Sequence, residues 1–334
     1  MTCQSLLSDL LTPAGRACQR LLDKPFRRVL RRRRSDRNDR RRSNSPPFEA
    51  SPRPERNPGS GGRAGIERHV AMDNGWPDLK GRFPFRLGTT SYILPAPILP
   101  NVRFLAPLVD EIELVLFESR LAENLPAETE IRELAHIGNA YDLRYNVHLP
   151  TDLALGDPDA AVRRAAGETL RKFYERTLPL APTAYVLHLE GQPAAGEGSA
   201  ALDRWRENCL SSLAALFDTG VDRECLAVEN LEAPFTAVAP IVAALDLNVC
   251  LDAGHLLRQS LPMADLFTPY GKKTVMIHLH GIDGGCDHRS LKGVPEAAWS
   301  FLRDFLETYR GGVSIEVFSR EDLRDSLTRM AELC

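Results

Sequence analysis

Residues 144–150, RYNVHLP, and residues 183–191, TAYVLHLEG, are short apolar runs joined by the amphipathic segment AAVRRAAGETLRKFYERTL at 160–178. Runs of this kind are typical of strands buried on both faces of a parallel sheet. The segment between them has the apolar spacing of a helix that covers one face of such a sheet. The stretch therefore predicts a strand–helix–strand unit.

The same unit recurs along the chain. Six further apolar runs follow the pattern: FRLGTTSY (85–92), EIELVLFE (111–118), CLAVENL (225–231), LNVCLDAGH (247–255), TVMIHLHG (274–281) and GVSIEVF (312–318). Eight strand–helix repeats in about 250 residues match a (β/α)₈ or TIM barrel. A doubly wound open sheet is the alternative, but it needs fewer units, and no G-x-G-x-x-G follows the first run. We predict an α/β fold in which residues 72–334 form a single catalytic barrel.

Residues 1–71 differ in composition from the rest of the chain. They carry 17 basic and 7 acidic residues and are rich in Ser, Pro, Gly and Arg. Such a segment cannot bury enough apolar surface to offset its ordering entropy, so we predict a disordered basic extension. It is either a tail for nucleic acid or an anionic membrane, or a segment outside the working protein, with Met72 as the natural start.

The remainder of the chain is acidic. Residues 72–334 carry 25 basic and 38 acidic residues, a net charge of −13. A body of this charge repels a polyphosphate backbone, so no nucleic-acid partner is expected. The seven cysteines are scattered without a C-x-x-C pair, which favours a reduced, cytoplasmic protein. No apolar run reaches the roughly 18 residues of a membrane span, so no membrane partner is expected.

Ligand-type side chains stand where the predicted strands end. In chain order they are Glu118, His148, His188, Glu229, Asp252 with His255, His278 with His280, and Glu316. In a (β/α)₈ barrel these ends converge on one mouth, where the active site forms. Several unpaired acids do not coexist in a buried site without cations. Asp, Glu and His suit Zn²⁺, Mn²⁺ or Fe²⁺, and the lack of Cys ligands indicates a catalytic metal site.

Each of these residues also has an ordinary interpretation. A single histidine such as His148 can be a satisfied core residue, and Glu118 can pair with a neighbouring arginine. The pattern as a whole favours the metal site, because seven consecutive strands that end in a ligand-type residue do not follow from packing alone.

The chain resembles the xylose-isomerase-like superfamily, which includes endonuclease IV and many sugar isomerases and epimerases. The D-x-x-H of Asp252 to His255 is a mark of that superfamily. The resemblance implies one ion held by Glu229, Asp252, His278 and Glu316. The nuclease branch has two further histidines, at the positions of His148 and His188 here. They imply a second ion, shared through a bridging Glu229.

A third metal is a feature of the nuclease branch that this sequence matches less well. There it is held by the D-x-x-H histidine and an Asp-x-His pair beyond strand seven. This chain has Asp287 and His288 side by side, without the intervening residue. The resemblance therefore implies two divalent ions in each chain and leaves the third in doubt.

A closer resemblance is to the cobamide-remodeling phosphodiesterases of bacteria. It is carried by FRLGTTSYILPAPILPNVRFLAPLVDEIELVLFE (85–118), IHLHG (277–281) and DHRSL (287–291). Members of that family open the nucleotide loop of corrinoids and release the lower ligand. The resemblance implies a hydrolase with a small corrinoid (cobalamin-like) substrate.

Phosphodiester hydrolysis assigns expected roles to the remaining polar residues. A pair of ions activates water, with Glu229 between them. His255, His280 and His288 are expected to orient phosphate or protonate the leaving group. Arg289 and Lys292 are expected to bind the substrate phosphate, and Glu118 to contact substrate.

Three alternatives to this function stay open. A sugar isomerase or epimerase needs one ion and two flanking carboxylates, which leaves His148 and His188 without a task. A DNA-repair nuclease acting at abasic sites needs a basic face. A non-catalytic corrinoid-binding module does not need the full ligand set, and its D-x-H-x-x-G signature is missing from the sequence.

Overall fold

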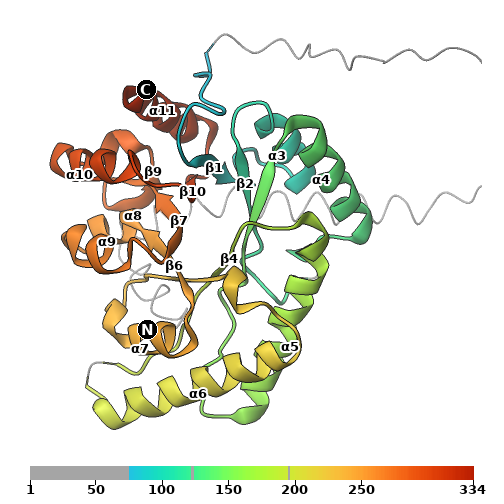
Figure 1. The fold of residues 1–334 in the computed structure, drawn as a ribbon, viewed down its shortest axis with the longest axis vertical. Helices are drawn as coiled ribbons and strands as arrows, with labels where there is room; N and C mark the ends of the chain where they lie inside the picture. Colours follow the sequence, from blue (N-terminus) through green and yellow to red (C-terminus); the bar gives the residue numbers. More distant parts are fainter. Residues whose placement is uncertain (1–74, 122–123, 195) are drawn as a thin grey trace, which may run out of the picture.

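The computed structural model describes residues 75–121, 124–194 and 196–334, so the predicted extension at residues 1–71 lies outside the described residues. Within these ranges, eight parallel strands close into a barrel surrounded by helices (Figure 1). The barrel strands are β1 (Arg86–Thr90), β2 (Glu111–Val115), β3 (Arg144–His148), β4 (Tyr185–Leu187), β5 (Leu226–Glu229), β6 (Asn248–Asp252), β7 (Thr274–Leu279) and β10 (Gly312–Ile315). The predicted (β/α)₈ barrel is confirmed.

The helices follow round the outside of the barrel in chain order (Figure 1). They are α3 (Ile98–Leu105), α4 (Glu128–Tyr141), α5 (Ala160–Thr177), α6 (Ser199–Asp218), α7 (Ala239–Leu245), α8 (Ala253–Arg258), α9 (Ala264–Tyr270), α10 (Glu296–Leu306) and α11 (Arg320–Met330). No helix in the described part of the chain is long and apolar enough to cross a membrane.

Helix α5 shows why these segments are helical. Asp159 caps its first turn by accepting a hydrogen bond from the amide of Ala161. Its buried residues, among them Leu170, Phe173 and Thr177, recur every three or four positions and form one apolar stripe. The stripe contributes to the large core between the strands and the helices.

The strands close in the order β1-β10-β7-β6-β5-β4-β3-β2. Their register sets Asp252 of β6 beside His278 of β7, and His278 beside Ser314 of β10. Inside the barrel, Val186, Ala227, Cys250 and Met276 form a small apolar cluster separate from the main core. The register therefore aligns the carboxyl ends of the strands with one another, and the apolar cluster fills the barrel interior beneath them.

A β-hairpin follows β7 and was not predicted from the sequence. Strands β8 (Gly281–Asp283) and β9 (Cys286–Arg289) pair antiparallel. Two glycines with positive φ, Gly284 at 58° and Gly285 at 78°, form the turn between them. Such a turn favours glycine because both central residues are left-handed. The hairpin returns His288 to the barrel mouth.

A candidate metal centre at the barrel mouth

Six side chains of the predicted metal set lie together at the carboxyl ends of the barrel strands. They are His148, His188, Glu229, Asp252, His278 and Glu316. Glu229 and Asp252 are the last residues of β5 and β6, and Glu316 follows β10 directly. All are buried except His188, which is partly exposed. The structure thus brings together the residues that the sequence placed at one mouth.

His148, His188 and Glu229 form the first group. Glu229 Oε2 lies 2.8 Å from Nε2 of His188 and 3.3 Å from Nε2 of His148. On the far side of the His148 ring, Nδ1 lies 3.0 Å from the carbonyl oxygen of Leu149, which accepts its proton. That hydrogen bond leaves Nε2 of His148 as the ligand atom.

Glu229 also belongs to the second group, with Asp252, His278 and Glu316. Its other oxygen, Oε1, lies 3.1 Å from Nδ1 of His278, and Oε2 of Glu316 lies 3.2 Å from the same nitrogen. Asp252 Oδ2 is 4.0 Å away. One ligand atom from each of the four residues falls within 4.8 Å of every other. Each oxygen of Glu229 therefore faces a different group, which is the arrangement of a bridging carboxylate.

Asp252 is held so that one oxygen remains available. Its Oδ1 caps helix α8 by accepting a hydrogen bond of 2.8 Å from the amide of His255, and Nε2 of His280 lies 3.3 Å from the same oxygen. Asn230 fixes the backbone of Asp252 from both sides, accepting from its amide at 2.7 Å and donating to its carbonyl at 3.0 Å. Oδ2 of Asp252 has no hydrogen-bond partner among the described residues.

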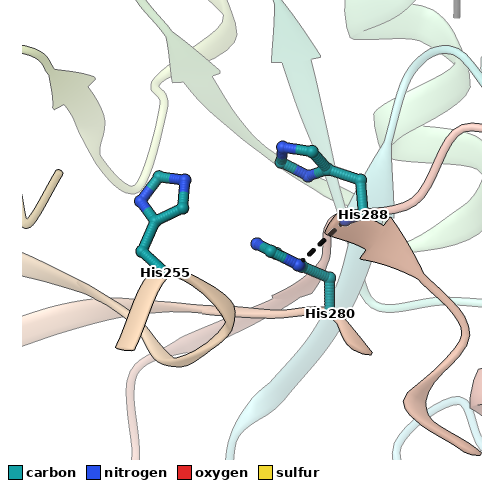
Figure 2. Close-up of side chains that lie close together, drawn as sticks. All are labelled: His255, His280 and His288. Carbon is teal, nitrogen blue, oxygen red and sulfur yellow. Dashed lines mark hydrogen bonds between the residues drawn. The ribbon is translucent and has the colours of Figure 1, made fainter. Parts of the chain in front are cut away.

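A third group contains His255, His280 and His288 (Figure 2). Nδ1 of His280 accepts a hydrogen bond of 3.0 Å from the amide of His288, whose φ of 51° is left-handed. The rings of His280 and His288 stack with centroids 4.2 Å apart. His255 and His288 each direct Nδ1 at a backbone carbonyl, that of Asn230 at 2.9 Å and that of Glu316 at 3.2 Å.

The backbone beneath His280 leaves no room for a side chain. Gly254 lies in the first turn of α8, and a Cβ atom there would stand 2.2 Å from the His280 ring. Contact this close cannot be relieved without moving the ring or the helix. Gly254 and the His288 amide together fix the plane of the His280 imidazole.

Burial and charge act in opposite directions on the pKa values of the site. Burial disfavours the imidazolium form, but the carboxylates of Glu229 and Glu190 outweigh it and raise the pKa of His188 to about 10. In the same way Asp252 raises the pKa of the buried His280 to about 9. The imidazoles of His278 and His188 in turn hold the pKa of Glu229 well below its usual range, against its burial. Without a cation, protons on the imidazoles balance the carboxylates.

The donor set fits a divalent cation. Buried oxygens of Asp252 and Glu316 lack hydrogen-bond partners among the described residues. Orphaned buried polar atoms are costly unless a further partner satisfies them. Carboxylate oxygens and imidazole nitrogens suit Zn²⁺, Mn²⁺ or Fe²⁺. The sulfur of Cys250 also lies close to Glu229 and His278, but burial raises the pKa of this thiol well above its usual range.

We expect the stability gap between metal-loaded and chelated protein to widen from pH 7 to pH 10. A histidine whose pKa is raised on folding stabilises the fold below its unfolded value near 6.5 and loses that contribution as the pH rises through the folded value. For His280 and His188 that loss begins near pH 6.5 and is complete near pH 9 and pH 10, respectively. A bound cation replaces the lost protons. Thermal melts at both pH values, with and without chelator, test this; an unchanged gap contradicts it.

Three residues expected to bind substrate lie elsewhere. Glu118 is exposed beyond β2, and its carboxylate forms no ion pair within the described residues. Arg289 pairs with Asp322 at 3.4 Å and Lys292 with Asp325 at 2.9 Å. Both cations therefore face α11, and the contacts of the structure do not join any of the three to the ligand groups.

Asp287 is not one of the ligand-type residues of the third group. Its Oδ2 accepts a 2.5 Å hydrogen bond from Arg258, which also pairs with Glu232 at 2.9 Å. The carboxylate of the adjacent Asp-His pair is thus directed at an arginine, and the third imidazole of the group comes from His280 instead.

Sequence reasoning missed Glu113, the residue that strand two contributes to the site. The expected strand ran to Glu118, but β2 ends at Val115. Glu113 is fully buried, and its Oε1 lies 3.1 Å from Nε2 of His278. The signal was present in EIELV, where acids alternate with apolar residues at the period of a strand.

The comparisons with known proteins agree on the fold. A family model described as xylose isomerase-like TIM barrel matches residues 109–333. No curated protein matches the chain by sequence.

Solved structures with the same fold are distant in sequence. A D-tagatose 3-epimerase-like protein has a TM-score of 0.60 at 19% identity, with 75% of this chain and 97% of that chain covered. D-Psicose 3-epimerase from Clostridium cellulolyticum has a TM-score of 0.55 at 17% identity, covering 73% and 90%. Endonuclease IV from Thermus thermophilus has a TM-score of 0.54 at 20% identity, covering 74% and 99%.

Proposed function

Because the chain belongs to the family of xylose isomerase-like TIM barrels, whose fold is shared by sugar epimerases and endonuclease IV, we propose that it is a metal-dependent phosphodiesterase. We propose further that its substrate is a cobamide, opened at the nucleotide loop so that the lower ligand is released. The single observation that carries the hydrolase assignment is that the two carboxylate oxygens of Glu229 face different ligand groups. One oxygen faces His148 and His188, and the other faces His278.

Two ligand groups joined by one carboxylate suit the chemistry of a phosphodiester. Divalent ions held in such a pair, when bound, neutralise phosphoryl charge and make water nucleophilic near neutral pH. His148, His188 and Glu229 would hold one ion, and Glu229, Asp252, His278 and Glu316 the other. An isomerase with one ion has no task for the first group.

Histidines beside the two ligand groups are the residues that can contact the phosphate and transfer a proton to the leaving group. His255 and His288 each donate Nδ1–H to a backbone carbonyl, which leaves Nε2 of each available. Against burial, the carboxylate of Asp252 raises the pKa of His255, so a protonated Nε2 of His255 can donate to a phosphoryl oxygen or protonate the departing alkoxide. Burial lowers the pKa of His288, and Nε2 of its neutral ring accepts a hydrogen bond or a proton instead. His280 acts through Asp252 instead, since its Nε2 lies 3.3 Å from Oδ1. A phosphate clamp from Arg289 and Lys292 would require both of their ion pairs with α11 to open, so the imidazoles are the better-placed contacts.

The corrinoid assignment rests on sequence. The segments at 85–118, 277–281 and 287–291 resemble those of cobamide-remodeling phosphodiesterases, and they supply β1, β2, part of β7 and part of the hairpin at the barrel mouth. The net charge of −13 on residues 72–334 disfavours a nucleic-acid substrate such as an abasic DNA site.

A sugar isomerase or epimerase is the second candidate. The observation in its favour is the group in which Glu229 and Glu316 both lie near 3 Å from Nδ1 of His278. Two carboxylates on either side of one ion can carry protons to and from a sugar carbon. Two of the three solved structures described above are named as epimerases or epimerase-like.

We expect purified protein with Mn²⁺, Zn²⁺ or Fe²⁺ to convert cobalamin into two products whose combined mass exceeds the substrate by one water. Their masses, measured by mass spectrometry, identify the ester bond that opens. Reactions with chelator, with a ketohexose and with abasic-site DNA serve as controls. Intact cobalamin together with an epimerised ketohexose would establish the second candidate in place of the first.

A further inference from the structure

We propose that Glu113 is a positioning residue of the metal centre, which fixes the His278 ring with Nδ1 toward the carboxylates and Nε2–H toward the barrel interior. The inference rests on the metal centre of the proposed function and adds to it a residue outside the ligand groups. It follows from a contact made across the lumen of the barrel.

Glu113 and His278 meet although their strands are not neighbours. Strands β1 and β10 lie between β2 and β7 in the barrel. Glu113 Oε1 nevertheless lies 3.1 Å from Nε2 of His278, and both side chains are fully buried. The alignment falls short of a linear hydrogen bond, and neither atom has another hydrogen-bond partner among the described residues. Each is therefore the natural partner of the other.

The second oxygen of Glu113 is held by β10. Ser314 Oγ donates a hydrogen bond of 2.6 Å to Glu113 Oε2. The carboxylate is thereby fixed at one end by a serine on the strand beside His278, which leaves Oε1 facing the imidazole. A side chain locked in this way can set the orientation of a ring without moving itself.

The two nitrogens of His278 have different surroundings. Nδ1 faces Glu229 and Glu316, the carboxylates of the second ligand group, while the carboxylate that faces Nε2 among the described residues is that of Glu113. A metal-binding imidazole is neutral and carries one proton, so a cation at Nδ1 requires the proton on Nε2. Once the ring is aligned by a cation at Nδ1, Glu113 would accept the hydrogen bond of that proton and so select the tautomer that leaves Nδ1 free.

The chain offers a matched control in the same strand. Glu111 is also a buried carboxylate of β2, but it pairs with Arg86 at 3.1 Å and with the hydroxyl of Thr183. Glu111→Gln likewise removes the charge of a buried carboxylate from β2, but it leaves the contact between Glu113 and His278 in place. Differences between variants at these two positions therefore report on the contact with His278.

The test compares Glu113→Gln, Glu113→Leu and Glu111→Gln with the full-length wild type. Zinc affinity is measured by competition with a chromophoric chelator, and the His278 tautomer by long-range ¹H–¹⁵N correlation of the zinc-loaded protein. Substitution of an outer-shell partner typically weakens metal binding about 10- to 100-fold. We expect Glu113→Leu to fall in that range and to lose the slowly exchanging Nε2 proton.

Glu113→Gln keeps an acceptor and is expected to keep the tautomer, with affinity lowered about 10-fold, at the weaker end of that range. Glu111→Gln is expected to bind zinc as wild type does. The proposal is overturned if both Glu113 variants match wild type in affinity and tautomer, or if Glu111→Gln weakens binding as much as Glu113→Leu. If Glu113→Leu does not fold, a wild-type affinity in Glu113→Gln overturns it. A wild type that binds no zinc refutes instead the metal centre of the proposed function.

Discussion

Glu229→Gln is expected to lose both bound ions and to lower phosphodiesterase activity by several orders of magnitude while the barrel stays folded. One oxygen of Glu229 lies 2.8 Å from His188 and the other 3.1 Å from His278. An amide in its place removes the negative charge and turns an N–H group toward one ligand group. Each 1.4 kcal/mol of lost transition-state stabilisation is about tenfold in rate, and a metal supplies several times that.

The measurements are metal content by mass spectrometry, turnover, and far-ultraviolet circular dichroism for the fold. Glu133→Gln is the matched control, because Glu133 lies on α4, pairs with Arg103 at 2.8 Å and belongs to none of the ligand groups. That variant should keep both ions. Wild-type turnover in Glu229→Gln with empty ligand groups would remove the metal mechanism.

His148→Ala and His188→Ala are each expected to reduce the metal content from two ions per chain to one and to abolish phosphodiesterase activity. Both imidazoles contact Oε2 of Glu229, and losing one of three protein ligands weakens a site strongly. The ion held with Asp252 and His278 keeps all its ligands. An isomerase would instead keep its metal content and change mainly in substrate affinity.

His136→Ala controls for the loss of a histidine as such, because His136 is exposed on α4. The metal content of this variant should equal that of wild type. Unchanged stoichiometry in both His148→Ala and His188→Ala would contradict the two-ion assignment and favour the isomerase.

The fold could be predicted because its physical basis is written along the chain. A buried parallel strand must be apolar on both faces, so eight such runs mark eight strands. Closure of the barrel then brings the strand ends together, which is why His148, Glu229 and Asp252 could be placed at one mouth without any knowledge of distances. Their role as ligands stays a prediction that the variants above test.

What the sequence could not supply has a common physical cause. An inward-facing acid inside a strand has no more sequence signal than one at its end, so Glu118 was chosen and Glu113 was not. Arg289 and Lys292 were given substrate roles by proximity in sequence, which stay predictions, but their ion-pair partners on α11 are remote in the chain. Long-range ion pairs of this kind have no local pattern from which they can be predicted.

Gly254 connects two positions that are read as unrelated in the sequence. The motif Asp252-Ala-Gly-His255 describes a helix start, whereas His280 lies directly after β7, one helix and one strand further along the chain. A methyl group at residue 254 would overlap the imidazole at residue 280. Histidine at position 280 therefore requires glycine at position 254, and a larger residue fits at 254 only when a smaller side chain replaces His280. In a barrel variant designed without His280, residue 254 becomes free to change, and the rigidity of the α8 entrance can be raised by an alanine that the present chain excludes.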